Sequence, residues 1–361
     1  MKVLLAAGGT AGHINPAIAI AKQFAEKENA EIQFIGTKRG METELVTREG
    51  FPISYIEVVG FKRKLTLENV KIAWQAFQGV RQAGILIRDF APDLVIGCGG
   101  YVSGPVLFCA HLQKKPTLIH EQNVIPGLTT KILSKFVDKV AISFEDTTQY
   151  IAKKKTVLTG NPIRENIVRV AAAQSKPSTT PTVLVVGGSL GAKVINDTMV
   201  ELVKELDADI EIVWASGKRE YEDIKKRTDP LPPQVKLVPY IYDMAQAIAD
   251  ADVVIARAGA ITVSEICAAG KSSILIPSPN VTHNHQAYNA KALEKKGAAK
   301  VISERELTPR KLKEILLEML MNRELLRNMS QNAKKMGITN AAEKIHEIGL
   351  QLIQENPHHN T

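Results

Sequence analysis

Residues 3–16 read Val-Leu-Leu-Ala-Ala-Gly-Gly-Thr-Ala-Gly-His-Ile-Asn-Pro, and this stretch decides the fold class. The small and apolar run at 3–7 predicts a buried strand of a parallel sheet. Gly8 and Gly9 end that strand, and Pro16 predicts the start of a helix. A glycine turn between a strand and a helix points backbone N–H groups and the positive end of the helix dipole toward one place. The stretch therefore predicts an α/β unit with an anion site, typically for phosphate.

This pattern occurs a second time in the chain. Residues 183–192, Val-Leu-Val-Val-Gly-Gly-Ser-Leu-Gly-Ala, repeat residues 4–13, Leu-Leu-Ala-Ala-Gly-Gly-Thr-Ala-Gly-His. A second pair of segments is also alike, with Asp-Leu-Val-Ile-Gly-Cys-Gly-Gly at 93–100 and Asp-Val-Val-Ile-Ala-Arg-Ala-Gly at 252–259. Two similar α/β domains, each with its first turn facing the other, would explain both repeats.

The composition limits the class of protein and its partners. The 361 residues suffice for two domains of ordinary size. The net charge of +8 indicates an acidic partner such as phosphate, nucleic acid or an anionic membrane, with plain solvation as the alternative. Aromatic residues make up only 5%, which argues against nucleic-acid binding by base stacking. Three cysteines without metal or disulfide spacing indicate a reducing cytosol, and neither a signal peptide nor a membrane span is predicted.

Alternating strand and helix patterns fill the rest of the chain. Helices are predicted between the strands and over residues 308–354, and residues 170–181 have the composition of a linker. The strands are predicted at residues 31–35, 93–97, 116–120, 155–158, 182–186, 210–215, 235–238, 252–255, 272–276 and 299–302. This order predicts two parallel sheets, and such sheets bind ligands at the carboxyl ends of their strands.

A dinucleotide-binding dehydrogenase is one alternative for such a fold. It would place an Asp or Glu about 20 residues after the glycines, to bind the ribose. Gly36 and Thr37 stand there instead, and the glycine turn departs from the G-x-G-x-x-G pattern. NAD binding is therefore disfavoured, while Lys38 and Arg39 keep NADP among the alternatives.

A basic and aromatic segment precedes the helix predicted at 68–88. Phe61, Lys62, Arg63 and Lys64 lead into this helix, and Trp74 lies off its apolar stripe. Aromatic side chains beside cations fit a contact with an anionic membrane surface, and a core aromatic beside a solvated basic loop is the alternative. The core stripe of the helix is predicted to hold Val70, Ala73, Phe77, Val80, Gly84 and Ile87.

Polar side chains at strand ends in the first half suggest acid–base chemistry. His13 follows the first glycine turn at the mouth of the predicted cleft, and other strand ends of the same domain carry Glu121 and Asn123. A histidine there can deprotonate a hydroxyl, because imidazole changes its protonation near neutral pH. A histidine that only bonds the backbone at a helix start is the alternative.

The second half fits a nucleotide sugar. Glu265 stands in the first turn of a predicted helix, where it either stabilises the helix dipole or accepts hydrogen bonds from two ribose hydroxyls. Arg164, Lys193 and the amides of residues 188–189 would neutralise a diphosphate without a metal. The polar loop at 277–290 follows a strand and fits a sugar.

Seven motifs together resemble the MurG family of glycosyltransferases, which is glycosyltransferase family 28. Each motif alone is weak evidence, whereas the set is highly specific. Two positions depart from the usual family pattern, with Ala11 in place of Gly and Leu190 in place of Gln. Between residues 8 and 290 the motifs are, in the family's order, Gly-Gly-Thr-Ala-Gly-His, Gly-Gly-Tyr-Val-Ser-Gly-Pro, His-Glu-Gln-Asn, Gly-Asn-Pro-Ile-Arg, Gly-Gly-Ser-Leu-Gly-Ala, Thr-Val-Ser-Glu and Gln-Ala-Tyr-Asn-Ala.

The resemblance implies a GT-B fold, in which two Rossmann-like domains face each other across a deep cleft. It implies an acceptor domain at 1–164, a UDP-GlcNAc donor domain at 165–340, and a C-terminal helix at 341–361 that crosses back to the first domain.

The activity implied by the resemblance is an inverting transfer of GlcNAc without metal or cofactor. The donor is UDP-GlcNAc, and the acceptor is the 4-hydroxyl of MurNAc in undecaprenyl-pyrophosphoryl-MurNAc-pentapeptide (lipid I). The product, lipid II, serves peptidoglycan synthesis and with it cell shape and division. A peripheral location on the cytoplasmic face of the bacterial membrane, through the basic and aromatic segment, accompanies this role, and no nucleic-acid partner is implied.

The resemblance also assigns roles to single residues. His13, Glu265 and Arg164 are implied as the catalytic residues, with His13 as the base. Arg164 and Ser189 would bind the diphosphate, Glu265 the ribose and the backbone of Ile241 the uracil. The other implied contacts are Thr10, Ala11, Gly12 and Asn123 on the acceptor side, Ala260, Ile261, Thr262, Val263 and Ser264 in the donor pocket, and Gln286 at the sugar.

Two rival functions stay open at this point. One is another GT-B enzyme, such as a UDP-GlcNAc 2-epimerase or a glycolipid galactosyltransferase, against which the motifs around Gly100 and Asn123 argue. The other is a non-catalytic protein that senses nucleotides or acts as a membrane scaffold.

Overall fold

The computed structural model describes residues 1–58, 68–164, 166–173, 180–188, 191–206 and 209–356. The chain divides into two compact units. Unit 1 consists of Met1–Pro162 and Asn340–Thr361, and unit 2 consists of Ile163–Thr339.

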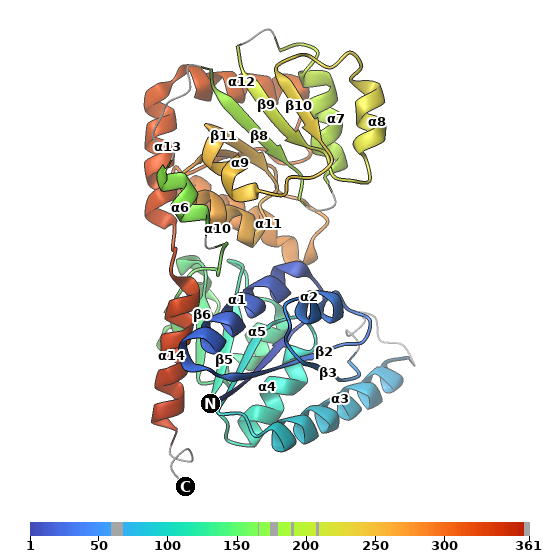
Figure 1. Cartoon of the computed structure of the whole chain (residues 1–361), viewed down its shortest axis with the longest axis vertical. Coiled ribbons are helices and arrows are strands. Elements are labelled where there is room, and N and C mark those ends of the chain that lie inside the picture. Colours follow the sequence, from blue (N-terminus) through green and yellow to red (C-terminus); the bar gives the residue numbers. More distant parts are fainter. Residues whose placement is uncertain (59–67, 165, 174–179, 189–190, 207–208, 357–361) are drawn as a thin grey trace. The chain divides into compact units, whose positions relative to one another are not determined.

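Unit 1 is built on a parallel sheet of seven strands in the order β3-β2-β1-β4-β5-β6-β7 (Figure 1). Side chains alternate across it, so that Val3 and Leu5 face one helical layer while Leu4 and Ala6 face the other. The strands are β1 (Lys2–Ala7), β2 (Glu31–Gly36), β3 (Ile53–Tyr55), β4 (Leu94–Gly99), β5 (Thr117–Glu121), β6 (Lys139–Ile142) and β7 (Thr156–Leu158).

Helices cover both faces of this sheet (Figure 1). On one face α14 lies along α1, where His346 Nε2 is 3.1 Å from Glu28 Oε1 and Gly349 leaves room for the ring of Phe24. The helical segments of unit 1 are α1 (Ala11–Glu28), α2 (Glu42–Arg48), α3 (Glu68–Phe90), α4 (Ser103–Leu112), α5 (Leu128–Leu133), α14 (Ala341–Glu355) and the short 3₁₀ turns η1 (Glu145–Gln149) and η2 (Lys153–Lys155).

Unit 2 is built on a parallel sheet of six strands in the order β10-β9-β8-β11-β12-β13. Its largest fully buried side chain is Trp214, whose indole N–H donates to Asn196 Oδ1 at 3.0 Å. The strands are β8 (Thr182–Val186), β9 (Glu211–Ala215), β10 (Val235–Val238), β11 (Val253–Ala256), β12 (Ser272–Leu275) and β13 (Lys300–Val301).

The helical segments of unit 2 begin with α6, which precedes β8, and the others lie between the strands and after the last of them (Figure 1). They are α6 (Asn166–Ala173), α7 (Lys193–Leu202), α8 (Tyr221–Arg227), α9 (Met244–Asp250), α10 (Ala260–Ala269), η3 (Thr282–Asn284), α11 (His285–Lys295), α12 (Pro309–Met321) and α13 (Arg323–Met336). Among the helices of the described ranges, none is long and apolar enough to cross a bilayer.

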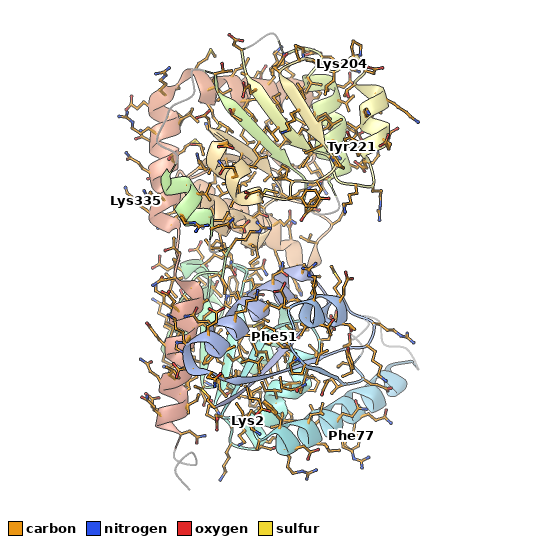
Figure 2. The ribbon with its side chains drawn as sticks, in the orientation of Figure 1. Lys2, Phe51, Phe77, Lys204, Tyr221 and Lys335 are labelled. Carbon is orange, nitrogen blue, oxygen red and sulfur yellow. The ribbon has the colours of Figure 1, made fainter. Side chains whose placement is uncertain are left out.

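The structure corrects several local predictions. Helix α1 begins at Ala11 rather than at Pro16, because Thr10 already has the extended backbone of an N-cap residue and Pro16 lies inside the helix. Phe77, labelled in Figure 2, was predicted for the core stripe of α3. Its side chain is instead 61% exposed. Only the later part of the described stripe reaches the core, since Val80 packs against it and Ile87 is fully buried.

Two strands escaped the sequence prediction. Strand β3 has three residues and borders β2 only, so its pattern is too short to stand out. Strand β6 begins with Lys139 and has four residues, yet it is paired on both sides. Neither strand borders β1 or β4, so missing them does not change the prediction for the turns after β1 and β4.

The strand order reverses next to the first strand of each sheet. The reversal lies between β1 and β4 in unit 1 and between β8 and β11 in unit 2. Open α/β sheets bind ligands in the crevice beyond the carboxyl ends of such strands. Both pairs of repeated segments end at these two switch points, so each unit offers one candidate site.

Candidate active site

The switch point of unit 2 contains a pocket of about 140 Å³. Gly188 follows β8, Gly217 follows β9 and Arg257 follows β11, so the pocket lies beyond the carboxyl ends of the strands. Apolar side chains from the β10–α9 connection and from α9, including Ile241 and Met244, line another side. A site with apolar walls and two guanidinium groups at its edge fits an aromatic base joined to an anionic group.

Two predicted residues pair with each other in this pocket. Arg164 Nη1 lies 2.7 Å from Glu265 Oε1. Glu265 lies one turn further into α10 than predicted, since the first turn of this helix holds no acidic residue. Its side chain is buried, whereas about half of the Arg164 side chain is exposed. Burial raises the pKa of the Glu265 carboxyl, and the neighbouring Arg164 acts in the opposite direction. Arg164 thus provides the positive charge beside the buried carboxylate of Glu265. A bound nucleotide diphosphate would compete with Glu265 for this guanidinium group.

Sequence reasoning missed Arg257. Its Nη1 donates to Glu304 Oε2 at 2.8 Å and to the carbonyl oxygen of Ile276 at 3.1 Å, and only 14% of its side chain is exposed. The signal was present, because Arg257 directly follows β11 where the equivalent position of the first half is Cys98. A cation at a strand end beside a glycine turn is a candidate anion ligand.

Other predicted donor residues differ in position. Ile241 and Thr262 line the pocket, while the side chain of Val263 is fully buried. Gln286 is partly buried, and its Oε1 accepts the backbone N–H of Ser278 at 2.9 Å. Ser189 lies outside the described residues, and Ala260, Ile261 and Ser264 are partly buried on α10.

In unit 1, His13 occupies the switch point. Its Nδ1 lies 3.1 Å from the carbonyl oxygen of Gly8. A carbonyl only accepts, so Nδ1 carries the proton and Nε2 of the neutral ring carries the lone pair. Gly99 is the last residue of β4, the other strand at this switch point, and its φ is +110°. A Cβ at this position would lie 2.8 Å from His13 Cδ2. The glycine therefore makes room for the imidazole.

The first glycine turn already holds an anion that belongs to the chain. Glu42 is fully buried, and its Oε2 accepts the N–H of Gly9 at 3.1 Å. Its Oε1 accepts the backbone N–H of Thr37 at 2.9 Å and the Thr37 hydroxyl at 2.7 Å. A dinucleotide would need the N–H groups of this turn for its phosphates and the end of β2 for its ribose. Glu42 already occupies both places, which disfavours NADP as well as NAD.

The His-Glu-Gln-Asn motif is mostly structural. His120 is buried, with Nδ1 accepting from Gln122 at 3.0 Å and Nε2 near the Gly160 carbonyl at 3.2 Å, and burial lowers its pKa to about 4. Glu121, expected at the ligand edge, is buried instead, and it accepts the N–H of Asn123 at 3.1 Å. Of the motif, only Asn123 is partly exposed.

The other predicted acceptor contacts lie on the first turn and the start of α1. Thr10 and Gly12 are exposed, and Ala11 is partly buried. Phe61, Lys62, Arg63 and Lys64 lie outside the described residues, as does the side chain of Trp74. Within the described ranges, no group of three or more His, Cys, Asp and Glu side chains is placed to hold a metal ion.

Family models cover most of the chain. The model of the "Glycosyltransferase family 28 N-terminal domain" matches residues 3–142, and that of the "Glycosyltransferase family 28 C-terminal domain" matches residues 182–345. The chain belongs to glycosyltransferase family 28. The predicted class of two parallel-sheet domains of the GT-B type is thereby confirmed.

Curated relatives and solved structures agree with this family. The UDP-N-acetylglucosamine--N-acetylmuramyl-(pentapeptide) pyrophosphoryl-undecaprenol N-acetylglucosamine transferase of Acetivibrio thermocellus is 51% identical, over 96% of this chain and 97% of its own length. The crystal structure of MurG from Acinetobacter baumannii is 32% identical to this chain and superposes on it with a TM-score of 0.84. The superposition covers 97% of this chain and 99% of the Acinetobacter protein. A UDP-GlcNAc 2-epimerase of Neisseria meningitidis, bound to UDP-GlcNAc, has a TM-score of 0.67 at 16% identity over 97% of this chain and shares the fold alone.

Proposed function

We propose that this chain transfers N-acetylglucosamine from UDP-GlcNAc to the 4-hydroxyl of MurNAc in lipid I, giving lipid II and UDP. The observation that carries the proposal is full-length identity of 51% to a transferase named for this reaction. The pocket of unit 2 supports the donor half of the proposal, because apolar walls and two arginines suit a uridine diphosphate.

The donor binds in unit 2 under this proposal. Arg164 and the amides of the second glycine turn neutralise the diphosphate, Glu265 binds the ribose, and the backbone of Ile241 meets the uracil. Gln286 contacts the sugar. Departure of UDP builds negative charge on its phosphates, and one donor already aimed at such charge is worth about 3–4 kcal/mol.

The acceptor reacts on unit 1 under this proposal. His13 Nε2 takes the proton of the MurNAc 4-hydroxyl while the oxygen forms its bond to C1 of GlcNAc. The bond from C1 to the phosphate oxygen breaks, and its electron pair leaves with UDP, so the sugar carbon inverts. Thr10 in the turn after β1, Gly12 at the start of α1 and Asn123 just after β5 would contact the acceptor.

Peripheral binding to the cytoplasmic face of the membrane completes the proposal. An exposed apolar cluster on unit 1 supports it, with Phe108 and Leu112 on α4, Leu128 and Ile132 on α5, and Phe136 just beyond. Phe108 and Phe136 meet edge to face at 6.1 Å. Exposed lysines on and beside these helices suit anionic headgroups; they are Lys114, Lys131 and Lys135.

One assay separates the proposed reaction from its rivals. The protein is incubated with radiolabelled UDP-GlcNAc, with and without a short-chain lipid I analogue. The proposal predicts labelled lipid II only when the analogue is present. Conversion of UDP-GlcNAc without any acceptor would instead identify an epimerase, and nucleotide binding without a product would identify a non-catalytic protein.

A membrane assay tests the apolar cluster separately. Replacing Ile132 and Phe136 with Ser should reduce sedimentation with vesicles of anionic phospholipid, because apolar area that would enter the interface is lost. A matched control replaces the exposed Met321 of unit 2 with Ser. Equal loss of binding in both variants, or in neither, would contradict the assignment of this surface.

A further inference from the structure

The peptide bond between Gly8 and Gly9 has a functional group at each end. Its carbonyl oxygen lies 3.1 Å from His13 Nδ1, and its N–H donates to Glu42 Oε2 at 3.1 Å. One planar peptide unit therefore joins a carboxylate to the imidazole that we assign as the base. Catalytic triads join a carboxylate to a histidine directly, whereas here a peptide stands between them.

Glu42 is held firmly in this position. It comes from the start of α2, is fully buried, and its second oxygen accepts two hydrogen bonds from Thr37, just after β2. A Cβ on Gly8 would lie 2.9 Å from Glu42 Oε1, and a Cβ on Gly40 would overlap the same carboxylate. Two glycines thus leave space for the carboxylate, which cannot move without breaking three hydrogen bonds.

We propose that Glu42 is a positioning residue for His13 and acts through the Gly8–Gly9 peptide. A carboxylate on the peptide N–H polarises the amide and makes the Gly8 carbonyl a stronger acceptor. The stronger acceptor holds the proton on His13 Nδ1 and leaves the lone pair on Nε2, where a base needs it. The inference rests on the proposed function for its kinetic consequence, but the tautomer of His13 does not depend on that function.

The wild-type protein provides the first test. Nitrogen-15 NMR of histidine-labelled protein distinguishes the two neutral tautomers of His13, after assignment with His13→Ala. The expected result is the form protonated at Nδ1. A ring protonated at Nε2 would overturn the inference without any variant.

The second test removes the charge but keeps the shape. Glu42→Gln should shift His13 toward the form protonated at Nε2. It should also lower kcat about ten- to a hundredfold, by analogy with the loss of groups that orient histidines at metal sites. The KM for UDP-GlcNAc should not change, because the donor pocket is in unit 2. Glu44→Gln is the matched control, since it removes the same charge from the exposed side of α2.

The outcomes separate this inference from the proposed function. A lower kcat with an unchanged tautomer makes Glu42 merely structural and overturns the inference. A shifted tautomer with an unchanged kcat supports the link but removes His13 as the base. If Glu42→Gln fails to fold by circular dichroism, Glu42→Asp keeps the charge, and it should retain the Nδ1-protonated form; loss of that form with the carboxylate present would count against the link.

Discussion

The two switch points have the same arrangement of strand, glycine turn and helix, but different side chains lie beside their glycine turns. In unit 1 the N–H of Gly9 is bonded to the buried carboxylate of Glu42, and an imidazole fills the space beside Gly99. In unit 2 Gly188 borders an open pocket whose charged groups include Arg164 and Arg257. The first glycine turn thus bonds to a carboxylate of the chain itself, whereas the second borders a pocket that two arginines line.

The neighbouring loop explains part of this difference. After β2 the chain supplies Glu42 to the first turn, whereas the residues after β9 bond to Asn196 of α7. The Asn196 side-chain amide donates to the carbonyl oxygen of Ser216 at 2.8 Å and to Glu220 at 2.6 Å. There the carboxylate of Glu220 accepts from the Asn196 side chain, whereas the carboxylate of Glu42 accepts from the N–H of Gly9. A repeated glycine motif therefore does not by itself say which copy binds phosphate.

The largest expected effect comes from removing a cation of the open switch point. Arg164→Ala should lower kcat about 100- to 1000-fold, because one donor to the charge that develops on the leaving diphosphate is lost. Arg169→Ala on α6 removes the same charge from an exposed site of unit 2 and should leave turnover unchanged. Steady-state transfer rates with the lipid I analogue measure both, and wild-type turnover in Arg164→Ala would remove it from the diphosphate site.

Two buried titratable groups, one in each unit, should respond to acid in opposite directions. Burial lowers the pKa of His120 from 6.5 to about 4, so unit 1 gains stability from its neutral ring above pH 6.5 and loses it as the pH falls toward 4. The full difference corresponds to about 3 kcal/mol. The raised pKa of Glu265 acts oppositely, since its contribution to unit 2 is present at low pH and is lost as the pH rises through that value.

Hydrogen exchange resolved by residue measures this contrast. Opening free energies of amides in β5 and β6 should fall between pH 6.5 and 4.5, and those in β11 and β12 should fall less. His120→Asn should flatten the dependence in unit 1, whereas His111→Asn at an exposed position should not. An unchanged slope in His120→Asn would contradict the assignment of this acid sensitivity to His120.

A smaller loss of kcat should follow when a side chain fills the space beside His13. Gly99→Ala adds a Cβ 2.8 Å from His13 Cδ2 at a φ of +110°, so the imidazole must move. Misplacement of a reacting group by about 1 Å costs about a hundredfold in kcat. Gly127→Ala, with no atom within 4 Å of the new Cβ, is the control. Equal turnover in the two variants would show that the position of His13 does not matter.

The smallest effect concerns donor affinity in unit 2. Glu265→Ala should raise the KM for UDP-GlcNAc about tenfold, because hydrogen bonds from ribose hydroxyls to a carboxylate are lost. The acceptor KM should not change, since acceptor contacts are assigned to unit 1. Initial rates over a range of donor concentrations test this, and an unaltered donor KM would take Glu265 out of the ribose site.

Sequence periodicity predicted most of the sheet that carries the sites. Strands β1, β4, β8 and β11 were all expected within one or two residues of their ends, because buried parallel strands are nearly continuous apolar runs. Arg164 and Glu265 were also expected at one site. Short strands such as β3, and the start of α1 ahead of Pro16, were not predicted, because propensity over few residues carries little information.

The amino-acid sequence by itself determined that the chain has two α/β units, where their glycine turns lie, and which family motifs they carry, because these depend on local periodicity and on residue order. Only the tertiary structure decided that Glu42 closes the first turn, that Arg257 reaches the second, and that Glu121 and Val263 are buried. The physical reason is distance along the chain. Glu42 lies 33 residues from Gly9, and no local pattern shows which oxygen will meet which N–H across a folded sheet.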